Sequence, residues 1–443
     1  MPFLRDSSAS RIEVLVNAEN NLSIRVPYKN STGNKWGRFD FTPDSDGVIL
    51  LKGGEHRQVT EAEKGEKNYD SVTGTWSTSD PNHYAIVAGA TMTITFTGSG
   101  FVFNSYADTR GGMWRFVIDS TYTVDISVWR AAAVIAEQTV IMGLEEKAHT
   151  VVATFLGDDP SHVPSGGAGT GRGWAYYDGN LSRQWKTIAY HGYTDTQLKQ
   201  SLYPTSNKEF AISCRPSGSE ENYKFIPYHT DSVSTITAQS VVIDARTIAD
   251  WGAEPAYYQY ADEVVITQTC KGFHPSDIVN ELIQYEIIFT VNTNGVFIRV
   301  KIDFISDTQI SSGFTIMLPV YTAFGKRMVT NRGIRYWTTA TDGSVTYIST
   351  PLKGVTFFDP AADYVVTMNY YLYNNVARLG QSGTPELPNT PYYIQHRDAN
   401  LQKLYTWAWH LTTVSAGASL SYGADIMIGE IPNANSVLPN KGY

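Results

Sequence analysis

Apolar side chains recur at alternate positions between residues 94 and 119, and this spacing constrains the fold more than any other feature of the chain. Ile94 and Phe96 share one face of an extended segment. Two further alternating segments, 101–103 and 113–118, follow a Gly-Ser-Gly turn and a glycine pair. A period of two predicts half-buried strands of an antiparallel sheet.

Two loops near these strands carry candidate binding residues. The first lies between two of the strands and contains Asp108 and Arg110, so we expect a carboxylate and a guanidinium at one end of a rigid sandwich. Loops that a rigid scaffold positions carry a large share of binding residues. The second loop, 165–174, is glycine-rich and ends in Arg172 and Trp174. It lacks the Lys-Ser/Thr pair and the helix pattern of a phosphate-binding loop, so we interpret it as a surface loop able to fold over a sugar.

The same part of the chain resembles the galactose-binding-like β-sandwich modules appended to many glycosidases and cell-surface proteins. Their pattern is a strand, a Gly-x-Gly turn, an aromatic strand, a loop, a strand ending in Ile-Asp, and later a Gly-Leu-x-x-x-x-His-Thr-Val segment. The matching residues are Gly100, Phe101, Phe103, Ile118, Asp119 and Gly143–Val151. The resemblance covers roughly residues 66–190 and implies a jelly-roll sandwich that binds carbohydrate. It also implies that Asp119 serves a turn and that His149 is structural.

On this basis we expect carbohydrate to contact five residues: Asp108, Arg110, Trp114, Arg172 and Trp174. Asp108 and Arg110 are expected to hydrogen-bond sugar hydroxyls. Trp114 or Trp174 is expected to stack on the C–H face of a sugar ring, because indoles offer a large apolar surface with a polar edge. Trp114 has an alternative position, since residues alternate along a strand and its ring also fits the sandwich core.

The second half of the chain predicts a larger antiparallel β-sandwich. Residues 285–291 and 296–304 flank an Asn-Thr-Asn-Gly turn, whose Asn-Gly pair suits the positive φ angles of a hairpin. The strand Gly313–Val320 follows, and together these segments resemble the C-terminal β-sandwich in tail proteins of some tailed bacteriophages. This second resemblance covers roughly residues 200–440 and implies a tail or baseplate protein.

These patterns divide the chain into three parts. Residues 1–62 are interpreted as N-terminal attachment strands or as strands added to a neighbour, with membership of the first sandwich as the alternative. Residues 63–192 are expected to form the galactose-binding-like carbohydrate-binding module, and residues 193–443 the C-terminal β-sandwich domain. The predicted fold class is all-β, a galactose-binding-like jelly-roll sandwich followed by a larger antiparallel β-sandwich.

Composition argues against several classes of partner. The chain has 34 Lys and Arg against 43 Asp and Glu, a net charge of −9 without a long basic run, which disfavours nucleic acid and anionic membrane surfaces. No apolar stretch approaches the ~20 residues that span a bilayer, and the first residues lack a signal-peptide pattern. The 28 Tyr and 10 Trp suit interfaces and sugar-stacking surfaces. The two cysteines, Cys214 and Cys270, fit either one disulfide or buried free thiols.

Catalytic and cofactor motifs are missing from the sequence. It contains no Gly-x-Ser-x-Gly elbow, His-Glu-x-x-His motif, Walker loop or Cys/His cluster, so we expect no enzymatic activity and no cofactor. Asp158 and Asp159 are weak candidates for binding Ca²⁺, a cation that takes oxygen ligands.

We therefore interpret the protein as a bacteriophage tail or baseplate structural protein that binds host cell-wall or capsular glycan non-catalytically. It is expected to be made in the host cytoplasm, to reside in the virion, and to assemble with other tail subunits as a homo-oligomer, with a trimer favoured. Two alternatives stay open. One is a glycoside hydrolase or lyase whose carboxylates come from distant strands, and the other is a purely structural tail subunit.

Overall fold

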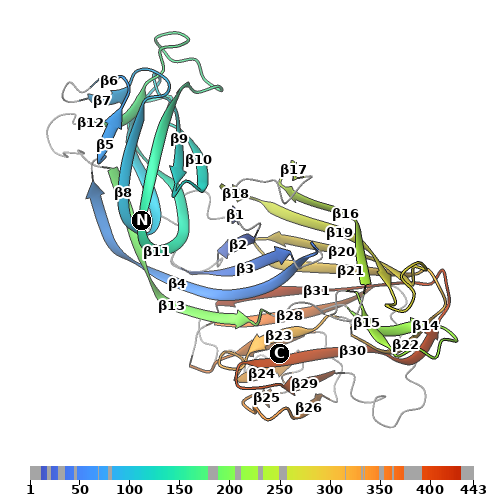
Figure 1. Cartoon of the computed structure of the whole chain (residues 1–443). Helices are drawn as coiled ribbons and strands as arrows, with labels where there is room; N and C mark the ends of the chain where they lie inside the picture. The colour runs from blue at the N-terminus through green and yellow to red at the C-terminus, as the bar shows by residue number, and fades with distance from the viewer. Residues whose placement is uncertain are drawn as a thin grey trace.

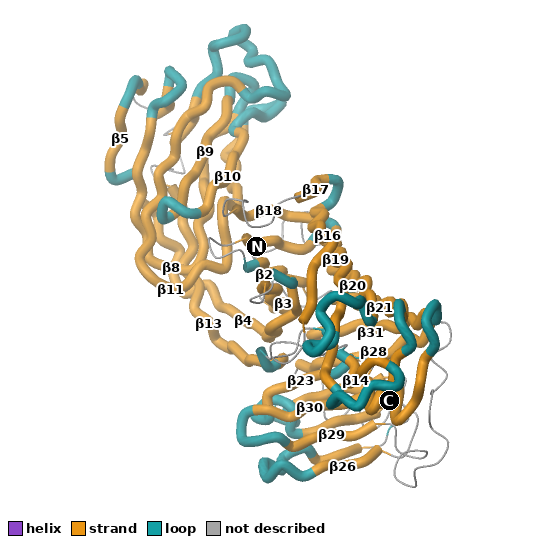
Figure 2. Tube along the Cα trace, turned by 45° about the vertical axis from the view of Figure 1, so that its right-hand side comes forward, coloured by secondary structure: helices purple, strands orange, loops and turns teal. Residues whose placement is uncertain are grey.

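The computed structural model describes most of the chain and shows it as strands and loops. Within the described residues the chain forms strands β1 to β31 and no helix (Figures 1 and 2). The all-β fold class predicted from the sequence is confirmed. The described residues are 11–16, 21–27, 35–43, 47–67, 69–77, 82–177, 188–204, 211–227, 233–248, 257–314, 316–330, 333, 335–348, 354–361, 364–373 and 392–430.

A smaller sandwich occupies one end of the molecule (Figure 1). Its two faces enclose a core of buried apolar side chains from residues 85–175. Part of an 18-stranded sheet that continues into the larger sandwich contains β5 (Ser71–Thr73), β8 (Thr91–Ala107), β9 (Gly112–Ile118), β10 (Tyr122–Ser127) and β11 (Val134–Asp158). A short second sheet contains β6 (Trp76–Ser77), β7 (Asn82–Ala85) and β12 (Gly173–Tyr177).

Strands β8 and β11 form one long antiparallel ribbon that folds over itself. Their pairing shifts register between Met142 and Lys147, opposite the Gly-Ser-Gly segment that the sequence predicts as a turn between two strands. The segment instead lies within β8, at the point where the ribbon bends. Because of the bend, Phe103 from the second half of β8 packs on Phe116 of β9, with ring centroids 4.9 Å apart. The alternating aromatic residues of β8 and β9 therefore pack into the single core of the smaller sandwich.

Strands β4 (Ile49–Lys67) and β13 (Ile188–Leu202) connect the two sandwiches. They pair antiparallel along most of their length and run as long curved ribbons from the larger sandwich toward the smaller one (Figure 1). A second connection is the pairing of Thr123 with Tyr257, which joins β10 to the larger sandwich.

The larger sandwich consists of two antiparallel layers around a core drawn from residues 12–50 and 202–428. Phe41 and Phe289 pack edge to face between the layers, with ring centroids 5.4 Å apart. The first layer, in spatial order, is β17 (Arg246–Ile248), β16 (Val233–Ile243), β19 (Glu263–Phe273), β20 (Ile283–Asn292), β21 (Gly295–Phe304), β31 (Ser419–Glu430), β28 (Tyr364–Tyr373), β27 (Gly354–Phe358), β24 (Arg327–Thr330) and β25 (Arg335–Trp337). The second layer, with β4 and β13, contains β1 (Ile12–Val16), β2 (Leu22–Pro27), β3 (Lys35–Pro43), β14 (Ile212–Pro216), β15 (Lys224–Ile226), β18 (Tyr257–Ala261), β22 (Thr308–Phe314), β23 (Leu318–Tyr321), β26 (Val345–Ile348), β29 (Tyr392–His396) and β30 (Leu401–Val414).

The N-terminal strands are part of this larger sandwich. β1 pairs with β18, and its residues Ile12, Val14 and Val16 are fully buried in the larger core. Of the interpretations considered for 1–62, a separate attachment segment and membership of the first sandwich differ from this arrangement, in which β1 is added to the larger sandwich. The physical reason is that short strands bury their apolar face only by pairing, and the partner strand lies more than 200 residues away. The predicted boundaries at 62 and 192 fall inside β4 and β13.

The predicted hairpin at 285–304 is present as β20 and β21. Asn292 pairs with Gly295, the Asn292 side chain accepts a hydrogen bond from the Asn294 amide, and Gly295 has a φ of 116°. Cys214 and Cys270 are free thiols buried in the core, which decides between the two alternatives for the cysteines. Among the described residues there is no helix long and apolar enough to span a membrane.

Candidate ligand-binding loops of the smaller sandwich

Three loops meet at the end of the smaller sandwich that lies away from the larger one, where Figure 2 shows them in teal. They are the β8–β9 loop (108–111), the β10–β11 loop (128–133) and the long loop between β11 and β12 (159–172). Backbone hydrogen bonds interlock them, including Ser165 N to Thr109 O at 2.9 Å and Arg172 N to Arg110 O at 2.8 Å. We refer to these three segments as the tip loops.

A glycine makes this close packing of the tip loops feasible. A Cβ added to Gly111 would lie 1.8 Å from the carbonyl oxygen of Val128, which is far inside van der Waals contact. The β8–β9 loop and the β10–β11 loop therefore approach each other at a spacing that no residue with a side chain permits.

Asp108 is the centre of a buried hydrogen-bond network in the tip loops. Its side chain accepts from the indole N–H of Trp174 at 3.0 Å and from Arg110 Nε at 2.7 Å. Its backbone carbonyl accepts from the Arg130 amide at 3.0 Å. Asp108 is only 6% exposed, so its oxygens serve the protein and not a ligand. The carboxylate that we expected to bind sugar hydroxyls instead holds the loops together.

The structure corrects the expected stacking role of the two tryptophans. Trp114 is 0% exposed and Trp174 is 1% exposed. The Trp114 indole donates to the carbonyl of Trp174 at 3.1 Å, while Trp174 packs against Tyr84 and Tyr106 with ring centroids 4.7 Å away in each case. Neither ring face is open to a sugar, because both indoles fill the core. The alternative inward position for Trp114 is the one observed.

The guanidinium groups of Arg110 and Arg172 both lie over Trp174. Their central carbons are 5.2 Å and 5.4 Å from the ring centroid, and Arg172 also lies 4.6 Å from the ring of Tyr84. The Arg110 side chain is 39% exposed, and its hydrogen bonds to Asp108 raise its pKa, although burial acts in the opposite direction. The structure thus brings together Asp108, Arg110, Arg172 and Trp174, with the two arginines as the members that reach solvent.

The two aspartates considered for Ca²⁺ do not converge on one point. Asp158 accepts from the amides of Gly169 and Gly171 at 2.5 Å and 2.7 Å, so it closes the glycine-rich loop. Asp159 is buried and accepts from the Ser127 hydroxyl at 2.5 Å. Within the described residues there is no group of three His, Cys, Asp or Glu side chains that could hold a metal ion. The two carboxylates act as loop closures.

Sequence reasoning missed one aromatic pair at the tip, of which Trp129 is half-buried and His162 is exposed. His162 stacks on Trp129, with ring centroids 3.7 Å apart and an angle of 12° between the planes. The His162 side chain is 40% exposed, and its Nδ1 lies 3.2 Å from Asp159. The only signal in the sequence is that Trp129 ends an alternating strand, and nothing in it pairs this residue with His162.

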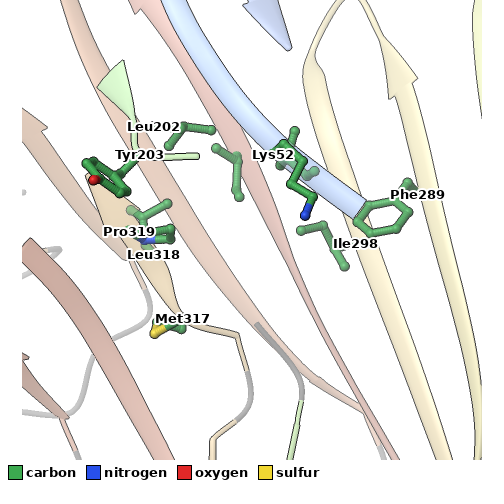
Figure 3. Close-up of a pocket in the computed structure, with 10 residues that line it drawn as sticks. Lys52, Leu202, Tyr203, Phe289, Ile298, Met317, Leu318 and Pro319 are labelled. Atoms are coloured by element: carbon green, nitrogen blue, oxygen red, sulfur yellow. The ribbon is translucent and has the colours of Figure 1, made fainter. Parts of the chain in front are cut away.

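A small hollow lies in the larger sandwich beside Leu202 and Tyr203, where β13 ends (Figure 3). Its lining residues are apolar apart from Lys52 and Tyr203, and they include Phe289, Ile298 and Met317. The space available to the centre of a water molecule is about 20 Å³, which suits one water and is far smaller than an ordinary ligand site. We therefore place the candidate site at the tip loops.

Comparisons with known proteins give no family for the chain. No protein-family model matches it, and no curated protein matches it. Among solved structures it is similar to the galactosidase domain of the alpha-galactosidase-sucrose kinase AgaSK, with 8% identity, a TM-score of 0.30, and 78% of this chain and 42% of that chain covered. It is also similar to the GH36 alpha-galactosidase AgaB from Geobacillus stearothermophilus, with 7% identity, a TM-score of 0.30, and coverage of 81% and 41%. The chain spans less than half the length of these structures, and likeness at this level supports no inference about function.

Proposed function

We propose that the protein binds bacterial cell-surface glycan without cleaving it, and that the tip loops of the smaller sandwich make the contact. The observation that carries the proposal is that three loops are interlocked at the free end of a rigid sandwich while Arg110, Arg172, Trp129 and His162 keep polar or aromatic surface there. Sugars are recognised by such combinations of hydrogen-bond donors and ring faces. Binding requires little ordering of the protein, because the loops are already fixed by internal hydrogen bonds.

We further propose that the protein acts as a tail or baseplate component of a bacteriophage. This part rests on the sequence resemblance over roughly residues 200–440, and the large two-layer sandwich would then contact neighbouring subunits. A homo-trimer is the assembly we expect. Light scattering on the purified protein measures the mass in solution directly, and a stable monomer at micromolar concentration would argue against this placement.

The glycan-binding proposal is tested by incubating the purified full-length chain with intact bacterial cells and with isolated wall glycan. We expect saturable binding without release of reducing sugar. Release of oligosaccharides would favour the alternative of a glycoside hydrolase or lyase. Absence of binding to every surface tested would favour a purely structural subunit. Parallel samples with EDTA check for a metal requirement.

A further inference from the structure

The three arginines at the tip differ in what their side chains bind. Arg110 donates from Nε and Nη2 to Asp108. Arg130 donates to the carbonyls of Ser127 and Trp129 and to the side chain of Gln138, at 3.2, 2.6 and 2.9 Å. For the Arg172 guanidinium the structure records no hydrogen bond and no ion pair among the described residues, and its only recorded side-chain contacts there are with aromatic rings.

Arg172 is nevertheless held in place by contacts of both its backbone and its guanidinium group. Its backbone amide donates to Arg110 O at 2.8 Å, and its carbonyl accepts from the Gly112 amide at 3.0 Å. Its guanidinium carbon lies over the rings of Tyr84 and Trp174, and these cation–π contacts do not occupy the N–H donors with an acceptor atom. The result is a half-buried, pre-positioned cation whose five donors lack a partner among the described residues.

We infer that Arg172 binds an oxyanion carried by the glycan, so that the tip loops select acidic over neutral saccharides. This inference rests on the proposed function. The planar guanidinium matches the two oxygens of a carboxylate or a phosphate and donates to them in a fork, which a neutral hydroxyl does not reproduce. Among the described residues, the neighbouring carboxylates of Asp108 and Asp158 do not compete for Arg172. Asp108 is bound to Arg110 and Trp174, and Asp158 to the glycine amides.

The oxyanion has two chemical sources in bacterial surface polymers, the carboxylate of a uronic acid and the phosphate of a phosphodiester-linked polymer. Three ligands distinguish them from neutral recognition: a polyuronate, the same polyuronate with its carboxyl groups reduced to alcohols, and a glycerol-phosphate polymer. Affinities are measured by titration calorimetry on the intact protein. We expect at least about tenfold tighter binding to one of the acidic polymers than to the reduced one, the scale of a charge-assisted hydrogen bond. That preference should diminish as salt concentration rises.

The variant that tests the residue is Arg172→Gln, with Arg172→Lys as a second variant that keeps the charge but loses the fork. The matched control is Arg115→Gln, which removes an arginine paired with Asp125 on the outer face of the same sandwich. We expect Arg172→Gln to abolish the acidic preference, Arg172→Lys to reduce it, and the control to retain it. Near-ultraviolet circular dichroism verifies that each variant is folded.

The outcomes separate the inference from the proposed function. Wild-type protein that binds wall glycan but binds the acidic and reduced polymers equally would overturn the inference and leave the proposed function standing. An acidic preference that persists in Arg172→Gln would also overturn it, by assigning the oxyanion to another residue. Wild-type protein that binds no glycan and no cell surface would overturn both.

Discussion

The indole nitrogen of Trp174 donates a hydrogen bond to Oδ1 of Asp108, at 3.0 Å, and thereby links β12 to the β8–β9 loop across 66 residues of sequence. Arg110 binds the same carboxylate from the solvent side. A carboxylate, an indole and a guanidinium therefore form one unit, in which the buried members position the exposed one. Asp108 and Trp174, which we expected to contact a ligand, instead hold Arg110 in position, and Arg110 remains available to a ligand.

Replacing Asp108 with Ala is expected to destabilise the smaller sandwich by about 3 kcal/mol, because it leaves the buried Trp174 N–H without an acceptor and Arg110 without its carboxylate. The measurement is urea unfolding followed by tryptophan fluorescence. Asp125→Ala is the control, since this residue forms an exposed pair with Arg115 that is worth at most about 1 kcal/mol. An Asp108→Ala protein with the wild-type unfolding midpoint would contradict the network described for the tip loops.

Gln268 connects the N-terminal part of the chain to the first layer of the larger sandwich. Its fully buried amide accepts from Ile49 N and donates to Ile49 O, both at 2.7 Å. Gln268→Ala is expected to cost about 2–4 kcal/mol, because two buried backbone groups of Ile49 lose their partners.

Thermal unfolding of Gln268→Ala should therefore begin at a lower temperature than that of wild type. The control is Gln284→Ala, a half-buried glutamine on the neighbouring strand β20, which is expected to change the free energy of unfolding by less than about 0.5 kcal/mol. Equal melting temperatures for the two variants would show that the Ile49 contact contributes little.

Asp159 predicts a dependence of stability on pH. Burial acts to raise the pKa of Asp159, but hydrogen bonds from the Ser127 hydroxyl and the Ser161 amide, together with His162, outweigh it and hold the pKa below its ordinary value. A lowered folded-state pKa means that the stabilisation is complete above the ordinary Asp value near 4, and is lost as pH falls through the folded-state value.

Chemical unfolding at a series of pH values from 7 down to 2 tests this contribution. The stability of wild type should fall more steeply below about pH 4 than that of Asp159→Asn, which lacks the titrating group. Parallel profiles for the two proteins would show that Asp159 contributes nothing to the acid sensitivity.

The two cysteines are expected to be unreactive in the folded protein. Cys214 and Cys270 are both fully buried, and burial raises the pKa of the Cys214 thiol, which disfavours the reactive thiolate. Ellman's reagent should label no thiol in native protein and two per chain in guanidinium chloride. Rapid labelling of the native protein, or fewer than two thiols after denaturation without reductant, would contradict the structure.

Local patterns in the sequence were sufficient to predict much of the fold. The hairpin around Asn292 and Gly295 follows from turn chemistry and alternation, and both act over a few residues. Asp119 lies in a turn and His149 is buried, in keeping with the roles expected for them, whereas the 2.6 Å contact between the two side chains was not predicted. Turns and hairpins of this kind can be predicted because short sequence patterns indicate them.

Features that depend on distant pairing were not predictable in the same way. β1 pairs with β18 only in the completed sheet, and nothing in the sequence near Ile12 indicates which strand will be its partner. The burial of Trp174 has a similar origin, since it requires Tyr84, Tyr106 and Asp108 from two other strands and a loop. The stack of His162 on Trp129 likewise forms only once two loops meet.

The most direct test of the central claim is hydrogen–deuterium exchange of the intact protein with and without saturating wall glycan. We predict slower exchange of backbone amides in the tip loops, at 108–111, 128–133 and 159–172. The β20–β21 hairpin at 283–304 serves as an internal control and should exchange at the same rate in both samples. Protection confined to the larger sandwich, or no change in the tip loops under saturating glycan, would contradict the assignment of binding to these loops.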